Sequence, residues 1–242
     1  MTLLDFLFPA RCLGCGRVGR YFCDRCTSKI RIIEVRETIC PVCERPAMAG
    51  ATHPRCHTRY AIDGLTSYFH YDGVIRKAIK AIKYRFASDL AKEFIDLVPT
   101  YLGNGTMKPS FARSTSLRAA EGRQWDNAVI VPIPLHPTRQ RHRGFNQTEV
   151  LGLLLANRFK VALKADVLLR KKKTTPQVEM RDRDERMKNM GGVFSYNNVT
   201  MKQCDNVLLF DDVFTTGATL RSAAAVLKRG GVKSVWGVTM AR

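Results

Sequence analysis

Residues 207–220, VLLFDDVFTTGATL, constrain the fold of this chain more than any other segment. A run rich in β-forming side chains ends at two adjacent acids, Asp211 and Asp212. A turn of small and hydroxyl residues follows, and a helical pattern begins at Leu220. In α/β proteins this order places ligand-binding groups at the carboxyl edge of a parallel sheet. The segment therefore predicts an α/β sheet with a binding site at its edge.

The chemistry of this segment suits a sugar phosphate. The two carboxylates can accept hydrogen bonds from neighbouring ribose hydroxyls. The turn offers backbone N–H groups, threonine hydroxyls and a helix N-terminus to a phosphate group. The alternative is a strand, an Asp-rich turn and a capped helix that bind nothing. The residues that we assign to the phosphate loop are Thr215, Thr216, Gly217, Ala218 and Thr219.

Seven of the eight cysteines lie between residues 12 and 56, mostly as C-x2-C pairs. Two thiolates at this spacing can bind one tetrahedral zinc ion, and a full set of four protein ligands is typical of a structural site. We predict two structural Zn²⁺ sites, because so short a module buries too little apolar surface to fold without them. A cross-braced pairing of the ligands, and His57 in place of His53, are alternatives. The predicted sets are Cys12, Cys15, Cys23 and Cys26, followed by Cys40, Cys43, His53 and Cys56.

The positive charge is concentrated in the second half of the chain. The net charge is +19, and residues 127–242 hold 20 basic and nine acidic side chains. A field of this sign attracts polyphosphates and nucleic acids alike, so it does not separate these ligand classes. The sequence contains no run of 18 apolar residues and no basic, apolar signal at its start, so we expect a cytoplasmic protein without membrane insertion.

Strand and helix patterns alternate beyond the cysteine module. We therefore expect an α/β domain with a parallel sheet over residues 61–242, joined to a zinc module over residues 1–60. Residues 103–126 are polar and without period, which predicts a long flexible insertion. The expected strands are 65–72, 127–134, 165–172, 193–196, 206–212 and 234–240, and the expected helices are 74–84, 89–102, 147–159 and 219–229.

Two basic segments are candidates for contact with phosphates. The strand ending at Val131-Pro132-Ile133-Pro134 leads into three arginines, which suits the diphosphate end of a ligand whose ribose lies at the two acids. Pro132 and Arg143 are the candidates there, with a plain basic surface loop as the alternative. The helix at 74–84 carries its bases on one face, either as a solvated surface or as the wall of a nucleic-acid groove. The candidate DNA-binding residues are Arg76, Lys77, Lys80, Lys83, Arg139, Arg141, Lys171, Lys172 and Lys173.

The chain as a whole resembles the competence protein ComF family, which joins a zinc ribbon to a type I phosphoribosyltransferase-like domain. Residues 207–219 fit the phosphoribosyl diphosphate (PRPP) motif of such domains. The opening FPARC, the paired cysteines and the RGFNQ run at 143–147 also fit, as do Thr175, Gln177, Arg186 and Asn189. His53 stands where a cysteine is usual, and the insertion at 103–126 is longer than expected.

The resemblance implies binding of PRPP with Mg²⁺, and a role for the chain with single-stranded DNA in natural transformation or DNA utilisation. It also implies contact with a DNA-translocating helicase. Residues 174–194 would correspond to a mobile hood over the site, although their alternating charges also suit an exposed helix. Two other functions remain open: a nucleotide-salvage phosphoribosyltransferase, and a non-catalytic scaffold or regulator with a vestigial site. The acceptor of any phosphoribosyl transfer is not assigned.

Overall fold

A computed structural model describes residues 9–84, 88–99, 128–171, 192–197 and 205–242 of the chain. The described elements are α2 (Asp24–Thr27), η1 (Val35–Glu37), η2 (Met48–Gly50), η3 (Pro54–Cys56), β1 (Gly64–Phe69), α3 (Gly73–Tyr84), α4 (Ser88–Asp96), β2 (Ala128–Pro132), α5 (Pro137–Arg143), α6 (Gln147–Phe159), β3 (Ala162–Leu163), β4 (Leu168–Arg170), β5 (Phe194–Tyr196), β6 (Asn206–Val213), α8 (Ala218–Arg229) and β7 (Ser234–Ala241).

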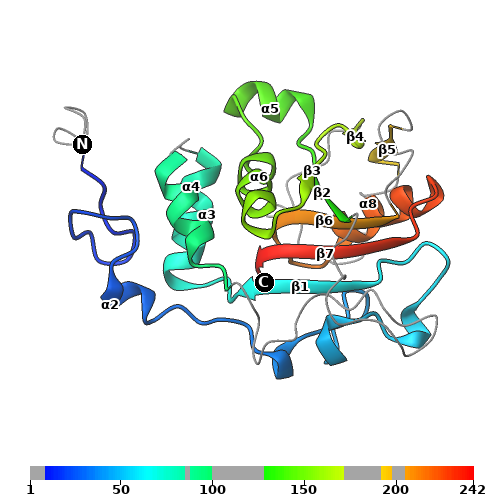
Figure 1. Cartoon of the computed structure of the whole chain (residues 1–242), viewed down its shortest axis with the longest axis horizontal. Coiled ribbons are helices and arrows are strands. Elements are labelled where there is room, and N and C mark those ends of the chain that lie inside the picture. The colour runs from blue at the N-terminus through cyan, green and yellow to red at the C-terminus, as the bar shows by residue number, and fades with distance from the viewer. Residues whose placement is uncertain (1–8, 85–87, 100–127, 172–191, 198–204) are drawn as a thin grey trace.

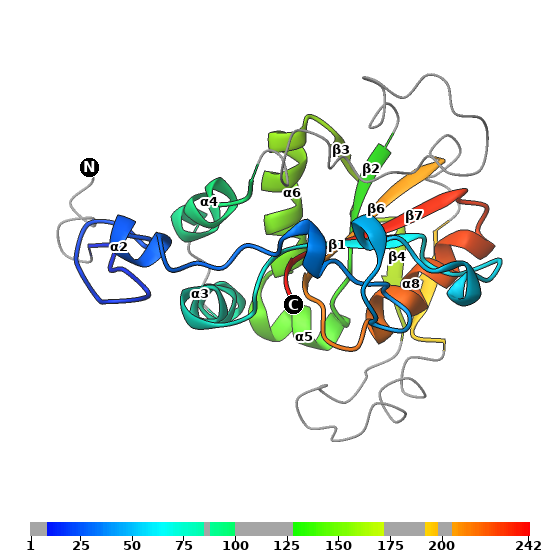
Figure 2. The same cartoon turned by 90° about the horizontal axis from the view of Figure 1, so that it is seen from below.

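Five parallel strands form the central sheet in the order β1-β7-β6-β2-β3, as Figure 1 shows. Alternate residues of β6 enter two different apolar clusters. Leu208 and Phe210 pack with α3, α4 and α6, whereas Val207 and Leu209 pack with α8. Figure 2 shows these helices on opposite sides of the sheet. Because both faces are buried, the strands are continuous apolar runs. The predicted α/β fold with a parallel sheet is confirmed.

The helix predicted at 74–84 is α3, whose buried stripe is Ile75, Ala78, Ile79 and Ile82. The helix predicted at 89–102 is shorter, since α4 ends at Asp96. The strand predicted at 165–172 is shorter: β4 spans Leu168–Arg170 and pairs antiparallel with β5 in a separate hairpin. The two-residue strand β3, which precedes it at Ala162–Leu163 and joins the central sheet, was not predicted. The predicted insertion at 103–126 and most of the predicted hood lie outside the described residues.

One helix, α5, was missed because its arginine-rich sequence resembles a loop. Its boundary signals are nonetheless local. His136 accepts a hydrogen bond from the Thr138 N–H at the N-cap, and Pro137 occupies the first turn. Gly144 ends the helix in the left-handed conformation at φ 78°. A proline just inside the start and a glycine just past the end could have revealed this helix.

The cysteine module runs along the edge strand β1, where an exposed strand edge would otherwise invite pairing with another chain. Antiparallel bridges join Ile32 to Phe69 and Ala51 to Gly64. Nearer the start of the module, the N–H groups of Tyr21 and Phe22 donate to the Glu93 carboxylate of α4 at 3.0 and 3.2 Å. The module is thus fastened to the sheet and to the helical layer.

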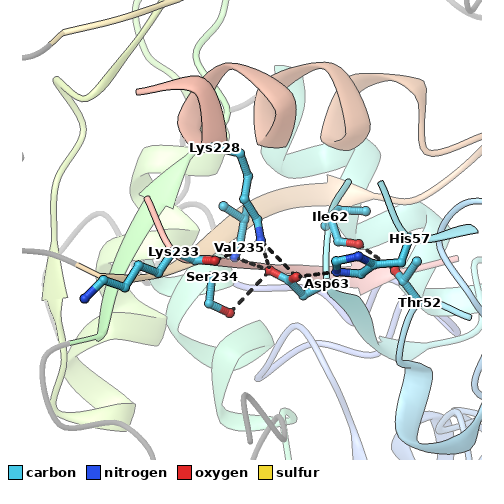
Figure 3. A network of polar contacts seen from close by, with 8 residues as sticks. All are labelled: Thr52, His57, Ile62, Asp63, Lys228, Lys233, Ser234 and Val235. Atoms are coloured by element: carbon cyan, nitrogen blue, oxygen red, sulfur yellow. Dashed lines mark hydrogen bonds and ion pairs between the residues drawn. The ribbon is translucent and has the colours of Figure 1, made fainter. Parts of the chain in front are cut away.

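Asp63 joins the end of this module to the carboxyl-terminal elements (Figure 3). Its carboxylate pairs with Lys228 Nζ of α8 at 2.8 Å and accepts the Val235 N–H of β7 at 2.7 Å. His57 Nε2 lies 3.3 Å from the same carboxylate. One acid therefore links the cysteine module, a helix and a central strand.

Candidate functional site

The adjacent acids Asp211 and Asp212 end β6 at the carboxyl edge of the sheet. Successive side chains of a strand point to opposite faces. Asp212 is only 5% exposed, and its carboxylate forms an ion pair with Lys83 Nζ of α3 at 2.9 Å. Gln147 Nε2 of α6 donates to the same carboxylate oxygen, Oδ2, at 3.1 Å. Asp212 therefore lies on the face that carries α3 and α6.

Asp211 has a different environment. Its Oδ1 accepts the backbone N–H of Asp212 at 2.9 Å. Burial and then the negative charge of Asp212 raise the pKa of Asp211 to about 7, against smaller opposing effects of the Asp212 backbone N–H, Lys83 and Arg170. Asp211 therefore changes charge near neutral pH, which makes it a candidate functional group.

Lys83 is held in its charged form by these acids. Burial alone would lower the pKa of Lys83, but Asp212 and then Asp211 outweigh that effect and raise it. The sequence places Lys83 with the basic face of α3, as a candidate for DNA contact. In the structure its side chain is 24% exposed and engaged with Asp212. Lys83 thus belongs geometrically to the acid site.

Arg143 extends this network toward the surface. Its Nη1 donates to Gln147 Oε1 at 3.0 Å, and its guanidinium lies 5.5 Å from the centre of the Tyr84 ring. The segment turns sharply because Gly144 adopts a left-handed conformation, which favours glycine. Arg143, Gln147, Asp212 and Lys83 consequently form one continuous polar chain across α5, α6, β6 and α3.

The end of β2 is fixed against the same region. Pro132 pairs with Phe210 of β6, and the Ile133 N–H donates to the Phe210 carbonyl at 2.8 Å. The Ile133 carbonyl accepts from Asn146 Nδ2 at 3.2 Å and Thr148 Oγ1 at 2.6 Å. These buried bonds hold the Pro132 strand end and the start of α6 beside the end of β6.

The predicted phosphate loop connects β6 to α8. Gly217 adopts φ 69°, and a Cβ at this position would lie 2.6 Å from the Phe214 ring. Glycine is therefore required by conformation and by space. The buried Thr216 Oγ1 has no hydrogen-bond partner among the residues that the structure describes. An unsatisfied hydroxyl beside the N-terminus of a twelve-residue helix fits a phosphate oxygen. Ala218 begins α8, Thr219 follows it and Thr215 is exposed at the loop surface.

Further basic side chains approach this edge. Burial and then the charge of Arg139 lower the pKa of Arg170, while Asp211 opposes this effect. Arg139, Arg170 and Asp211 are therefore electrostatic neighbours from α5, β4 and β6. Arg141 and Lys171 are exposed, and Lys172 and Lys173 lie outside the described residues. On α3, Arg76, Lys77 and Lys80 are exposed, and Lys77 Nζ lies 3.5 Å from the Gly14 carbonyl of the first cysteine group.

The cysteines form two separate groups in sequential order. Within each group the four ligand atoms lie within 4.8 Å of one another, a geometry able to hold a metal ion. The ligand chemistry suits tetrahedral zinc. This arrangement favours sequential over cross-braced pairing. The first group is Cys12, Cys15, Cys23 and Cys26, and the second is Cys40, Cys43, His53 and Cys56.

The two candidate histidines are separated by the structure. His53 Nδ1 lies 3.3 Å from Cys43 Sγ, and its Nε2 lies 3.0 Å from the Pro46 carbonyl. A backbone acceptor on the second ring nitrogen is typical of a metal-binding histidine. His57 instead contacts Asp63. His53 is thus the histidine that is placed with the cysteines.

Comparisons with known proteins agree with this organisation. Residues 3–57 match the double zinc ribbon domain. Competence protein ComFC of Bacillus subtilis is 27% identical over 231 residues, which cover 91% of this chain and 83% of that protein. Competence protein F of Haemophilus influenzae is 33% identical over 47% of this chain and 50% of its own length. DNA utilization protein YhgH of Salmonella typhimurium is 27% identical over 87% of this chain and 86% of its own length. The resemblance to the ComF family is confirmed.

In the part of the chain that the structure describes, none of the helices is both long and apolar enough to cross a membrane.

Proposed function

We propose that this chain, a relative of the ComF competence proteins along almost its whole length, binds PRPP and acts on or with single-stranded DNA. The observation that carries the PRPP proposal is the convergence of three segments at one sheet edge. These segments are the acids of β6, the loop before α8, and the Pro132 strand end with Arg143. A helix start, acids and arginines at one edge match the phosphate, ribose and diphosphate of PRPP.

The proposed assignment places each part of the ligand. Residues 215–219 would bind the 5′-phosphate, and the unsatisfied Thr216 hydroxyl supports this. The acids that end β6 would form the ribose side of the site. Pro132 and Arg143 would border the diphosphate, with Arg139 and Arg170 adding positive charge to this end.

A hard cation such as Mg²⁺ prefers oxygen ligands, and the diphosphate oxygens of PRPP would offer these. Bound Mg²⁺ would neutralise diphosphate charge. The residues of this chain would hold the ribose and keep the two phosphoryl ends apart, which exposes the anomeric carbon to a nucleophile. A salvage enzyme would release diphosphate when supplied with a suitable base.

The proposal for DNA rests on two observations. Relatives over most of the chain are named for competence and DNA utilization. The exposed basic face of α3 lies next to the first cysteine group, because Lys77 Nζ contacts the Gly14 carbonyl. We propose that this surface contacts the phosphate backbone, with residues 1–60 as a zinc module and 61–242 as the PRPP domain. Its members are Arg76, Lys77 and Lys80, and Arg139, Arg141 and Lys171 are second candidates.

Calorimetry with PRPP and Mg²⁺ tests the first proposal. The wild type should bind, and Thr216→Val should weaken binding about 5- to 30-fold because a phosphate hydrogen bond is lost. Thr58→Val, outside the loop, is the matched control. Absence of any heat of binding from the wild type would reject PRPP as the ligand. A panel of purines, pyrimidines and orotate, monitored for released diphosphate, tests the salvage alternative.

A salt titration tests the second proposal. Affinity for a single-stranded oligonucleotide should fall steeply with salt, because phosphate contacts release counterions. The double variant Arg76→Ala, Lys80→Ala should reduce the salt slope by about 1.4, at about 0.7 per contact. Lys233→Ala, on the far loop before β7, should leave the slope unchanged. An affinity that does not depend on salt would contradict backbone contact.

A further inference from the structure

The two neighbouring acids of β6 have different surroundings, although the sequence presents them as an equivalent pair. Asp212 points to the face of the sheet covered by α3 and α6, whereas Asp211 points to the face that carries α8. A ligand bound on one side of the strand end therefore cannot use both carboxylates in the same way.

Asp212 is already satisfied from within the protein. Its Oδ2 receives Lys83 Nζ at 2.9 Å and Gln147 Nε2 at 3.1 Å, and its side chain is 7% exposed. A charge removed from water needs such partners, since burial without them is costly. The other end of Gln147 accepts from Arg143. Gln147 thus connects Asp212 to Arg143, so the position of Asp212 also constrains the Arg143 side chain.

Asp211, in contrast to Asp212, has no side-chain hydrogen-bond partner among the described residues. Its one hydrogen bond with the described residues comes from the neighbouring Asp212 N–H. The charged groups that act on it are Asp212 of β6, Lys83 of α3 and Arg170 of β4, with Arg139 of α5 beside Arg170. Its second oxygen remains available to a hydroxyl group, which is what a ribose offers.

We propose that Asp211 alone contacts the ribose of PRPP, and that Asp212, Lys83 and Gln147 are positioning residues that fix the end of β6 and orient Arg143. This inference rests on the proposed PRPP function and narrows its ribose contact from both acids of β6 to Asp211, because Asp212 is already paired with Lys83 and Gln147. Lys83 and Asp212 carry opposite charges and contact each other, so their net effect on the site is small. Removal of one partner leaves an uncompensated buried charge, whereas removal of both does not.

Four variants separate the roles: Asp211→Asn, Asp212→Asn, Lys83→Met and the double variant Lys83→Met, Asp212→Asn. Lys92→Met, at an exposed position of the neighbouring helix α4, is the matched control. Asp211→Asn should fold and bind PRPP about 10- to 100-fold more weakly. Lys83→Met should lower Tm by roughly 5–15 °C, because Asp212 stays buried without its partner. The double variant should recover most of that Tm and bind PRPP within about threefold of wild type.

The pH profile of PRPP binding gives a signature that a purely structural role would not produce. Asp212 raises the pKa of Asp211 and Lys83 lowers it. The midpoint of the profile should therefore move up in Lys83→Met and down in Asp212→Asn. It should return toward the wild-type midpoint in the double variant, because both charges are gone.

A double variant that binds PRPP as weakly as Asp211→Asn would overturn the inference, because Asp212 or Lys83 would then touch the ligand. A double variant with no recovery of Tm would also overturn it. A wild type without PRPP affinity would reject the proposed function instead. The positioning role would then be decided by Tm alone: recovery in the double variant supports it, and no recovery removes it.

Discussion

Arg221 Nη1 donates a hydrogen bond to the backbone carbonyl of Pro41 at 2.7 Å, although 180 residues separate the two along the chain. Pro41 lies between Cys40 and Cys43 of the second metal-binding group. Arg221 stands in the first turn of α8, and a Cβ on Gly217 would meet its Nη1 at 2.8 Å. The contact therefore joins the second zinc ribbon to the proposed phosphate loop. Beside this contact, a cavity of about 560 Å³ lies between the second cysteine group and α8.

Replacement of Arg221 with alanine should affect both stability and ligand binding. The Pro41 carbonyl loses its donor, which should reduce the free energy of unfolding by about 1–2 kcal/mol. PRPP should bind about 3- to 10-fold more weakly, because the phosphate loop loses a lateral support. Thermal unfolding and calorimetry measure the two effects. Arg229→Ala, two turns farther along α8, is the control and should leave PRPP affinity unchanged. Equal affinities in Arg221→Ala and wild type would restrict the contact to stability.

The affinity for PRPP should increase with pH through neutrality. Asp211 has a pKa raised to about 7, so it is largely protonated at pH 6 and largely charged at pH 8. The charged form accepts stronger hydrogen bonds from ribose hydroxyls. The dissociation constant for PRPP should therefore fall between pH 6 and pH 8 in the wild type. In Asp211→Asn it should change much less with pH. Any rise in affinity that persists in Asp211→Asn would come from the phosphates of the ligand.

Stability of the free protein should change with pH in the opposite direction. The pKa of Asp211 in the folded state, about 7, lies above the ordinary value near 3.9 in the unfolded chain. The contribution of this group is therefore complete at low pH and is lost as pH rises through about 7. Asp211→Asn should consequently be more stable than wild type at pH 8, by about 1–3 kcal/mol. Urea unfolding at pH 5 and pH 8 measures this difference. A variant less stable than wild type at pH 8 would contradict the assignment.

Metal content should distinguish the two histidines. His53→Ala should reduce bound zinc from two to one equivalent per chain, because His53 lies with Cys43 in the second group. Since each structural site contributes on the order of 10 kcal/mol to folding, the variant should also unfold at lower temperature. His57→Ala loses a contact with Asp63 and should keep both metal equivalents. Elemental analysis of the purified variants gives the result directly. Loss of zinc from His57→Ala would reverse the ligand assignment.

Asp63→Ala should be strongly destabilising. The change leaves Lys228, whose side chain is 9% exposed, without its carboxylate and removes the acceptor of the Val235 N–H. The expected cost is about 2–4 kcal/mol. Asp205→Ala is the matched control, since its ion pair with Lys233 is exposed and should contribute at most about 1 kcal/mol. Chemical denaturation of both variants tests the comparison, and equal losses would show that burial of the Asp63 network has no special weight.

The features that the sequence predicted are those encoded within short segments. The strand, acids, loop and helix at 206–229 lie in one continuous stretch, and propensity and turn chemistry act on neighbours along the chain. The order of the cysteines likewise brings each set of four together with sequential pairing. Helix α5 was missed for a different reason: its proline and glycine boundary signals were outweighed by its arginines.

The α/β class, the two groups of cysteines and the segment that forms the loop before α8 follow from the amino-acid order alone, because each depends on local spacing. Which side chains meet across the chain is set by the folded structure. Gln147 donates a hydrogen bond to Asp212, which is 65 residues away in the sequence. Lys83, unlike the exposed bases of α3, pairs with the same acid. Such pairings follow from how helices pack on the two faces of a sheet. The linear order of residues does not specify which distant side chains this packing brings into contact.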